Sequence, residues 1–149
     1  MSTAFGTNPR NDRDDAIHLG ASWYPEMWPP EEWPKDIARM REVGFSLIRL
    51  FEFAWKRFEP ADGQFAFDWA REILDQLHAA GIQAMLGTPT AAPPAWLTSA
   101  HPDVLKISAD GQQATHGKRK HYNHHSRTYR RYARRIAETG YAHHIERLM

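Results

Sequence analysis

One carboxylate stands among aromatic side chains in the segment 46–60. The segment reads SLIRLFEFAWKRFEP, and Glu52 directly follows an apolar run that predicts a buried strand. A carboxylate accepts hydrogen bonds from hydroxyl groups, and an indole such as that of Trp55 offers a flat apolar face on which a pyranose can stack. The segment therefore indicates a carbohydrate pocket. The alternative is a structural ion pair of Glu52 with Arg49 or Arg57, with the aromatic residues as plain core.

Such a pocket needs elements that bring these side chains to one edge of a sheet, and the sequence predicts them. Three short apolar runs predict strands, and three amphipathic segments predict helices, in the order β-α-β-α-β-loop-α. The strands are predicted at 17–23, 46–52 and 82–88, and the helices at 31–43, 69–80 (with Asp68 as N-cap) and 126–139. This order predicts parallel strands joined by right-handed crossovers.

Two architectures begin in this way, the doubly wound sheet and the (β/α)8 barrel. No Gly-x-Gly-x-x-Gly string opens the first helix, and the loops after the strands are rich in Trp, Pro and acidic residues. Active sites of (β/α)8 enzymes lie on such loops. The predicted fold class is therefore α/β, specifically the N-terminal three βα units of a (β/α)8 TIM barrel, which is incomplete.

Composition limits the classes of function. The 149 residues carry a formal net charge of +1 and contain no cysteine, so the chain has no disulfide and no thiolate metal site. Residues 1–16 are polar, which predicts a disordered leader and not a signal peptide. No apolar stretch is long enough to span a membrane, and a cytoplasmic location is the expectation.

A basic segment supports an alternative function, which is nucleic-acid binding through residues 118–135. Tyrosines are interleaved with its arginines, a pattern that could serve base stacking. The competing interpretation is a solvated helix face, with Arg130, Arg131, Arg134 and Arg135 opposite Tyr129, Ala133 and Ile136. The nearly neutral net charge disfavours a dedicated nucleic-acid binder.

Four motifs in order resemble glycoside hydrolase family 42, the β-galactosidases built on a (β/α)8 barrel. They are LGASWYPEMWP at 19–29, IRLFEFAW at 48–55 with the later Glu59–Pro60, LGTPTAAPPAWL at 86–97 and KRKHY at 118–122. The resemblance implies retaining hydrolysis of terminal β-galactosides. That chemistry needs two carboxyl groups about 5–5.5 Å apart, an acid/base and a nucleophile. In the family the acid/base glutamate follows an asparagine, and both the acid/base and the nucleophile lie beyond these four motifs. No Asn-Glu pair occurs in this chain. The isolated chain is therefore expected to be inactive.

The resemblance also assigns candidate site residues. Arg119 aligns with the family arginine that hydrogen-bonds the galactosyl hydroxyls, and Glu52 would orient Arg119 or another polar group. Trp23 and Trp55 would help to wall the sugar pocket, with packing as the alternative role. Glu26 reads as a loop carboxylate rather than a catalytic one.

Further expectations concern metals, partners and the C-terminus. Some family members bind zinc through cysteines, which are absent here, and the adjacent His124 and His125 are a weak metal signal, so no metal and no cofactor are expected. Family members are often trimers, which implies a homo-oligomer for a full-length enzyme. Residues 17–139 are assigned to the barrel, and 140–149 depart from the family pattern, which suggests a truncated gene product.

Overall fold

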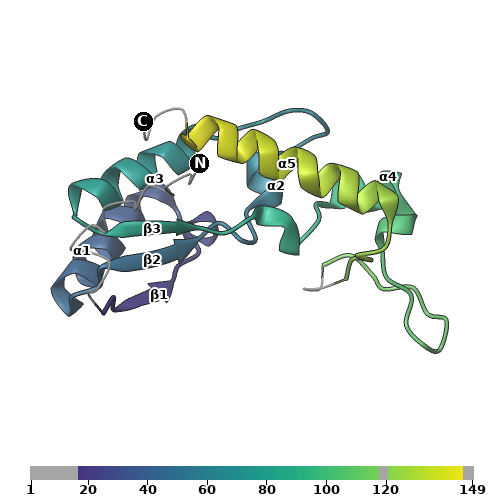
Figure 1. Ribbon diagram of the computed structural model, residues 1–149, viewed down its shortest axis with the longest axis horizontal. Coiled ribbons are helices and arrows are strands. Elements are labelled where there is room, and N and C mark those ends of the chain that lie inside the picture. The colour runs from purple at the N-terminus through teal and green to yellow at the C-terminus, as the bar shows by residue number, and fades with distance from the viewer. Residues whose placement is uncertain (1–16, 118–120, 146–149) are drawn as a thin grey trace, which may run out of the picture.

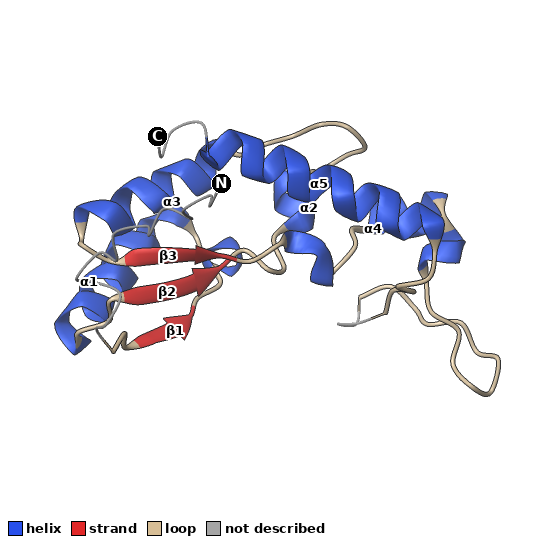
Figure 2. Cartoon of the chain, in the orientation of Figure 1, coloured by secondary structure: helices blue, strands red, loops and turns tan. Residues whose placement is uncertain are grey.

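The fold is a three-stranded parallel sheet with helices against one face and a long helix beyond the strand ends (Figures 1 and 2). The computed structural model describes residues 17–117 and 121–145. The strands are β1 Gly20–Ser22, β2 Leu47–Leu50 and β3 Gln83–Leu86, in the order β1-β2-β3. The predicted leader 1–16 and the residue Arg119 lie outside the described residues.

The helices follow the strands in the predicted alternation. They are α1 Trp33–Val43, α2 Trp55–Phe58, α3 Asp68–Ala79, α4 Ala95–Ala100 and α5 Arg127–Ile145, with short 3-10 turns η1 Pro25–Met27, η2 Pro30–Glu32, η3 Pro89–Ala91 and η4 Pro102–Val104. The helices α1 and α3 cover one face of the sheet (Figure 1). Among the described residues, no helix is both long and apolar enough to pass through a bilayer.

The structure corrects several predicted boundaries. The strands are three or four residues long, and the segments 53–67 and 89–125, where no helix or strand was predicted, contain the short helices α2 and α4. Asp68 was predicted as the N-cap of the second helix, but it is the first helical residue, and its carboxylate pairs with Arg71 at 2.9 Å instead. The final helix runs on past residue 139 to Ile145, because Gly140 does not interrupt it.

The two faces of the sheet differ in burial. Ile48 and Leu50 of β2 have no exposed surface and face the helices, as alternation along a strand requires. Arg49 of β2 is paired in register with Met85 of β3, and both are exposed on the opposite face. In a closed barrel this opposite face would point into the interior.

Close strand contact depends on one glycine. A Cβ at Gly20 would lie 2.2 Å from the carbonyl oxygen of Leu47, the residue with which Gly20 is paired. No side chain fits there without displacing backbone, so β1 can pair with β2 in this way only with glycine at this position.

An aromatic cluster fixes the chain after β2. The ring of Phe51 makes edge contacts with Phe58 at 5.3 Å and with Trp69 at 5.2 Å between centroids, and Phe58 stacks on Trp69 at 5.0 Å. The guanidinium of Arg57 lies over the Trp69 ring at 4.2 Å, a cation–π contact. Arg57 is therefore held by aromatic rings and does not pair with Glu52.

Candidate functional site

The carboxyl ends of the three strands carry the loops in which the sequence analysis placed the site. The strand β1 leads into Trp23, β2 leads through Phe51 into Glu52, and β3 leads into Gly87. Parallel strands present their carboxyl ends at one edge, so these three loops are neighbours.

Glu52 is aimed by a strained turn. Phe51 has φ 77°, the only positive φ at a non-glycine among the described residues, and its ring is buried. The carbonyl of Phe51 accepts a hydrogen bond from the amide of Ala54 at 3.1 Å, which closes a turn with Glu52 and Phe53 at its tip. A left-handed aromatic residue costs on the order of 1–3 kcal/mol, and such strain persists only where packing holds it. The aromatic cluster around Phe51 supplies that packing.

The strand β3 approaches Glu52 closely. The amide of Gly87 donates to the carbonyl of Leu50 at 2.9 Å. A Cβ at Gly87 would lie 3.0 Å from the Cβ of Glu52 and 3.2 Å from its backbone. Glycine at position 87 thus lets the third loop begin directly beside the backbone of Glu52.

The ion pair foreseen as the alternative role of Glu52 is present. Oε1 of Glu52 lies 2.7 Å from Nη2 of Arg49, and the Glu52 side chain is 14% exposed. The alignment is not that of a hydrogen bond, however, and both carboxylate oxygens are buried without a hydrogen-bond partner in the described structure. Glu52 therefore pairs with one cation and keeps its capacity to accept hydrogen bonds.

A second carboxylate, that of Glu26, lies close enough to Glu52 for their charges to interact. Burial raises the pKa of Glu26 above its ordinary value, and the nearby backbone amide of Glu26 itself opposes this rise. The charge of Glu52 adds to the rise, and that of Arg57 opposes it. Both carboxylate oxygens of Glu26 are also buried without a hydrogen-bond partner among the described residues. Sequence reasoning set Glu26 aside as a loop acid, because nothing in the sequence shows that the first two loops meet.

Replacement of Glu26 by Gln is expected to stabilise the chain at about pH 7. The gain is limited to about 1 kcal/mol, because the Glu26 side chain is partly exposed and solvent screens its charge. A carboxyl with a raised pKa in the folded state binds protons more tightly than when unfolded. Its ionisation therefore costs stability above that folded pKa and costs nothing below the unfolded value. Urea unfolding of both proteins at about pH 7 and about pH 4 should show the difference only at the higher pH. Glu31→Gln, an exposed neighbour, is the control, and an equal gain at both pH values would contradict the assignment.

The structure places the other candidate residues as follows. The Trp23 indole is buried and donates to Asp36 of α1 at 3.2 Å. The Trp55 indole has no exposed surface and donates to Glu59 at 3.1 Å. Both tryptophans are buried in the core, and a role for them in walling a sugar pocket stays a prediction. The described structure brings Glu52 to the strand edge, whereas Arg119 lies outside the described residues.

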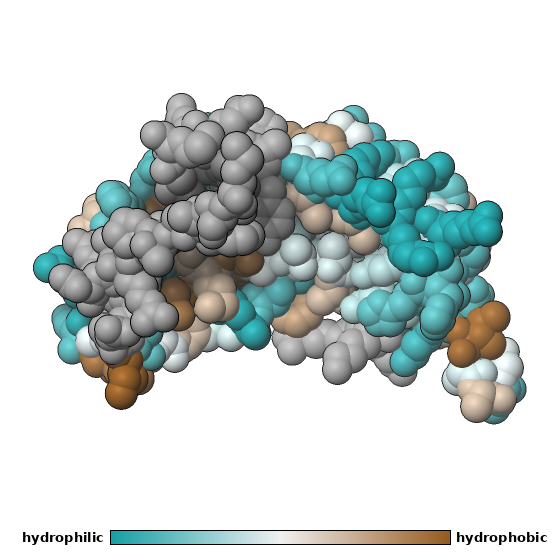
Figure 3. Space-filling view, viewed as in Figure 1, coloured by the Kyte–Doolittle hydropathy of each residue, from teal (hydrophilic) through white to brown (hydrophobic). Residues whose placement is uncertain are grey.

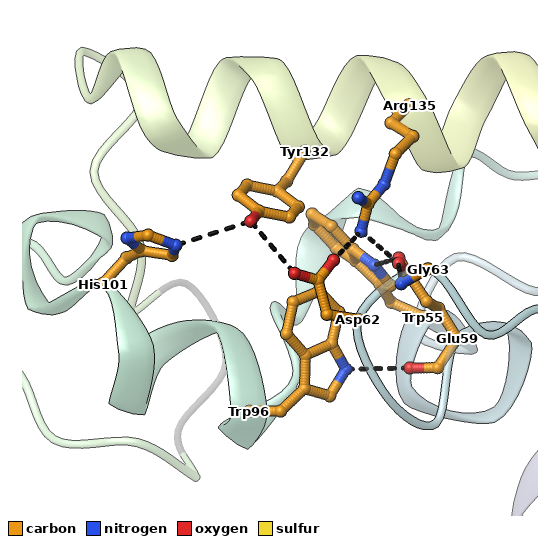
Figure 4. A network of polar contacts seen from close by, with 8 residues as sticks. All are labelled: Trp55, Glu59, Asp62, Gly63, Trp96, His101, Tyr132 and Arg135. Atoms are coloured by element: carbon orange, nitrogen blue, oxygen red, sulfur yellow. Dashed lines mark hydrogen bonds and ion pairs between the residues drawn. The ribbon is translucent and has the colours of Figure 1, made fainter.

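Sequence reasoning missed a polar network between the second loop and α5 (Figure 4). Glu59 is completely buried and accepts hydrogen bonds from Trp55, from the amide of Gly63 at 2.9 Å and from Arg135. Arg135 also binds Asp62 at 2.7 Å. The hydrogen bond from Arg135 is the main cause that lowers the pKa of Asp62 below its ordinary value.

Two aromatic groups extend this network. Tyr132 lies 3.4 Å from both Asp62 and His101, and the Trp96 indole donates to the carbonyl of Glu59 at 2.9 Å (Figure 4). The Glu59–Pro60 pair was noticed as a motif, but no sequence signal joins it to an arginine 76 residues away.

The arginine-rich helix α5 is mostly a solvated face, with one correction. Arg130, Arg131 and Arg134 are exposed, and the surface over the first half of α5 is hydrophilic (Figure 3). Arg135 was predicted on that face, but it turns toward Glu59 and Asp62. Tyr129 and Tyr132 are buried, so their rings are not available to stack on bases. Within the described ranges, no group of three or more His, Cys, Asp or Glu side chains could hold a metal ion.

Comparison with known proteins finds similar sequences that are named β-galactosidases. The family model described as "Beta-galactosidase" matches residues 22–146. The protein named Beta-galactosidase BgaA from Thermus sp. is 46% identical over 118 residues, which are 79% of this chain and 18% of that protein. The Beta-galactosidase of Arthrobacter sp. is 40% identical over 119 residues, 80% of this chain and 17% of that protein.

Solved structures agree with these matches. The polyextremophilic β-galactosidase from the haloarchaeon Halorubrum lacusprofundi superimposes with a TM-score of 0.79 at 41% identity, covering 83% of this chain and 18% of that chain. A structure titled Gan42B, a GH42 β-galactosidase, gives a TM-score of 0.82 at 27% identity over 86% of this chain and 19% of that chain. The chain thus spans less than a fifth of the length of the relatives it matches.

Proposed function

Since this chain belongs to glycoside hydrolase family 42, the β-galactosidases, we propose that a full-length protein containing these residues hydrolyses terminal non-reducing β-D-galactose residues. The match of residues 22–146 to the family carries the proposal. The fold prediction is confirmed, because the structure is α/β with a three-stranded parallel sheet and its neighbours are β-galactosidases of this barrel family.

The proposed division of labour follows from the geometry at the strand edge. Retaining hydrolysis requires an acid/base carboxyl and a nucleophile about 5–5.5 Å apart. Family resemblance puts both beyond this segment, so the segment supplies binding and support. Glu52, with buried carboxylate oxygens that lack hydrogen bonds in the described structure, would accept hydrogen bonds from a sugar hydroxyl or from Arg119. Arg119 would donate to the galactosyl hydroxyls.

A chimera tests the proposal. Residues 22–139 of this chain would replace the matching segment of the Thermus relative, and hydrolysis of a nitrophenyl β-galactoside would be measured. We expect kcat within about tenfold of the parent enzyme, equivalent to about 1.4 kcal/mol in the barrier. The parent enzyme is the control. A folded chimera without hydrolytic activity would contradict the proposal.

The nucleic-acid alternative receives no support from the geometry. Tyrosine rings between the arginines could have served stacking, but two of the three, Tyr129 and Tyr132, are buried, and Tyr122 is partly buried.

A further inference from the structure

An open groove of about 300 Å³ lies across the three loops at the carboxyl ends of the strands. Its apolar wall includes Met27 from the first loop, Phe53 from the second and Pro93 from the third. Its polar lining comes from Lys56 of α2 and from two histidines, His116 and His121. The groove therefore combines an apolar wall with nitrogen groups that can carry positive charge.

The charge in this groove is unbalanced. None of the described residues that line it is acidic. Lys56 is exposed and makes no ion pair with another described residue, whereas Arg49, Arg71 and Arg135 each make one. An ammonium that faces a groove without a carboxylate favours an anionic occupant.

The protonation of His116 follows from its neighbour. The hydroxyl of Thr98 lies 3.2 Å from the carbonyl of Ala95, to which it can donate, and 3.1 Å from Nδ1 of His116. When the single hydroxyl proton goes to Ala95, Nδ1 carries the proton of the Thr98 contact and donates it. The next proton that His116 takes up is then added at Nε2, which converts the ring into a cation with a second N–H donor.

The surroundings of His116 favour its neutral form. Burial lowers the pKa of His116, and the positive charges of His121 and Lys56 lower it further. The His116 and His121 rings lie 5.2 Å apart between centroids. The negative charge of an anion bound between His116, His121 and Lys56 raises the pKa of His116 and so opposes the effect of the two positive charges. Binding of the anion and uptake of a proton by His116 therefore favour each other.

We propose that this groove binds a small organic oxyanion, such as a sugar acid, through the ammonium of Lys56 and the protonated ring of His116. The apolar wall contacts the body of the ligand, so the groove is expected to prefer an organic oxyanion to a bare inorganic anion. This binding goes beyond the proposed function, because it does not depend on hydrolysis of a galactoside.

The test uses the full 149-residue chain, kept dilute, with thermal unfolding followed by tryptophan fluorescence. D-glucuronate is the probe, D-glucose the uncharged comparison and sulfate the inorganic one, all at matched ionic strength. The carboxylate of glucuronate stays ionised between about pH 5.5 and about pH 8, so a change in affinity over that range reports on the protein.

We expect glucuronate to bind about tenfold more tightly at about pH 5.5 than at about pH 8. Lys56→Gln and His116→Gln should each weaken binding at the lower pH by about tenfold or more, and His116→Gln should also remove the pH dependence. Lys106→Gln, an equal loss of charge at an exposed position, should behave as the parent chain. Equal stabilisation by glucose or by sulfate, or unchanged binding in His116→Gln, would overturn the proposal.

Discussion

Replacement of Arg135 by Met is expected to destabilise the chain by about 3–5 kcal/mol, since it leaves a buried carboxylate without its cation. Glu59 has no exposed surface, and Arg135 is its charged partner in the described structure. The hydrogen bonds from Trp55 and Gly63 remain, but they do not neutralise the charge. The expected loss is a large part of the stability of an ordinary domain.

Urea unfolding gives the measurement, and the chain offers a matched control. Arg134→Met removes the same charge from the exposed side of the same helix and should change stability by no more than about 0.5 kcal/mol. The double variant Glu59→Gln/Arg135→Met should recover part of the loss, because the buried charge is then gone. Equal effects of the Arg134 and Arg135 substitutions would show that the network contributes little.

The 149-residue chain by itself is expected to hydrolyse no nitrophenyl β-galactoside above a blank preparation. Retaining chemistry needs two positioned carboxyl groups, and both belong to parts of the barrel that the four motifs do not include. The sheet also has three of the strands of a barrel in the described structure, with β1 and β3 at its edges.

Those edges predict a second property of the isolated chain. Unpaired strand edges associate with other chains, and Met85 on β3 is 50% exposed. We therefore expect self-association that increases with protein concentration, measurable by analytical ultracentrifugation. Hydrolysis by a purified, monomeric chain would refute both expectations.

The sequence predicted the order of the three strands and of the helices α1, α3 and α5, because each of these elements has a local signal. Helical spacing identified α1 and α3, and Gly44 ends α1 with φ 87°, a left-handed conformation that suits glycine. The turn at Phe51 had no such signal, since a left-handed aromatic residue is held there by rings that are distant in sequence.

The site was predicted in part. Glu52 lies at the strand end as expected from the apolar run before it, and its partner Arg49 was one of the two cations foreseen. The nearness of Glu26 to Glu52, and the contact of Arg135 with Glu59, depend on how loops and helices dock. Side-chain pattern within one element does not determine such contacts, so they appear only in the folded chain.

The central claim is that this segment binds the sugar and leaves the bond-breaking chemistry to other residues. Kinetics of Glu52→Gln in the Thermus chimera test it most directly, with Glu52→Asp as the conservative variant. We predict that kcat/KM falls about 10- to 100-fold, mainly through KM, with the pH profile of kcat unchanged and partial recovery in Glu52→Asp. A fall in kcat of about a thousandfold or more with unchanged KM, or the loss of one limb of the pH profile, would contradict the claim and make Glu52 a catalytic residue.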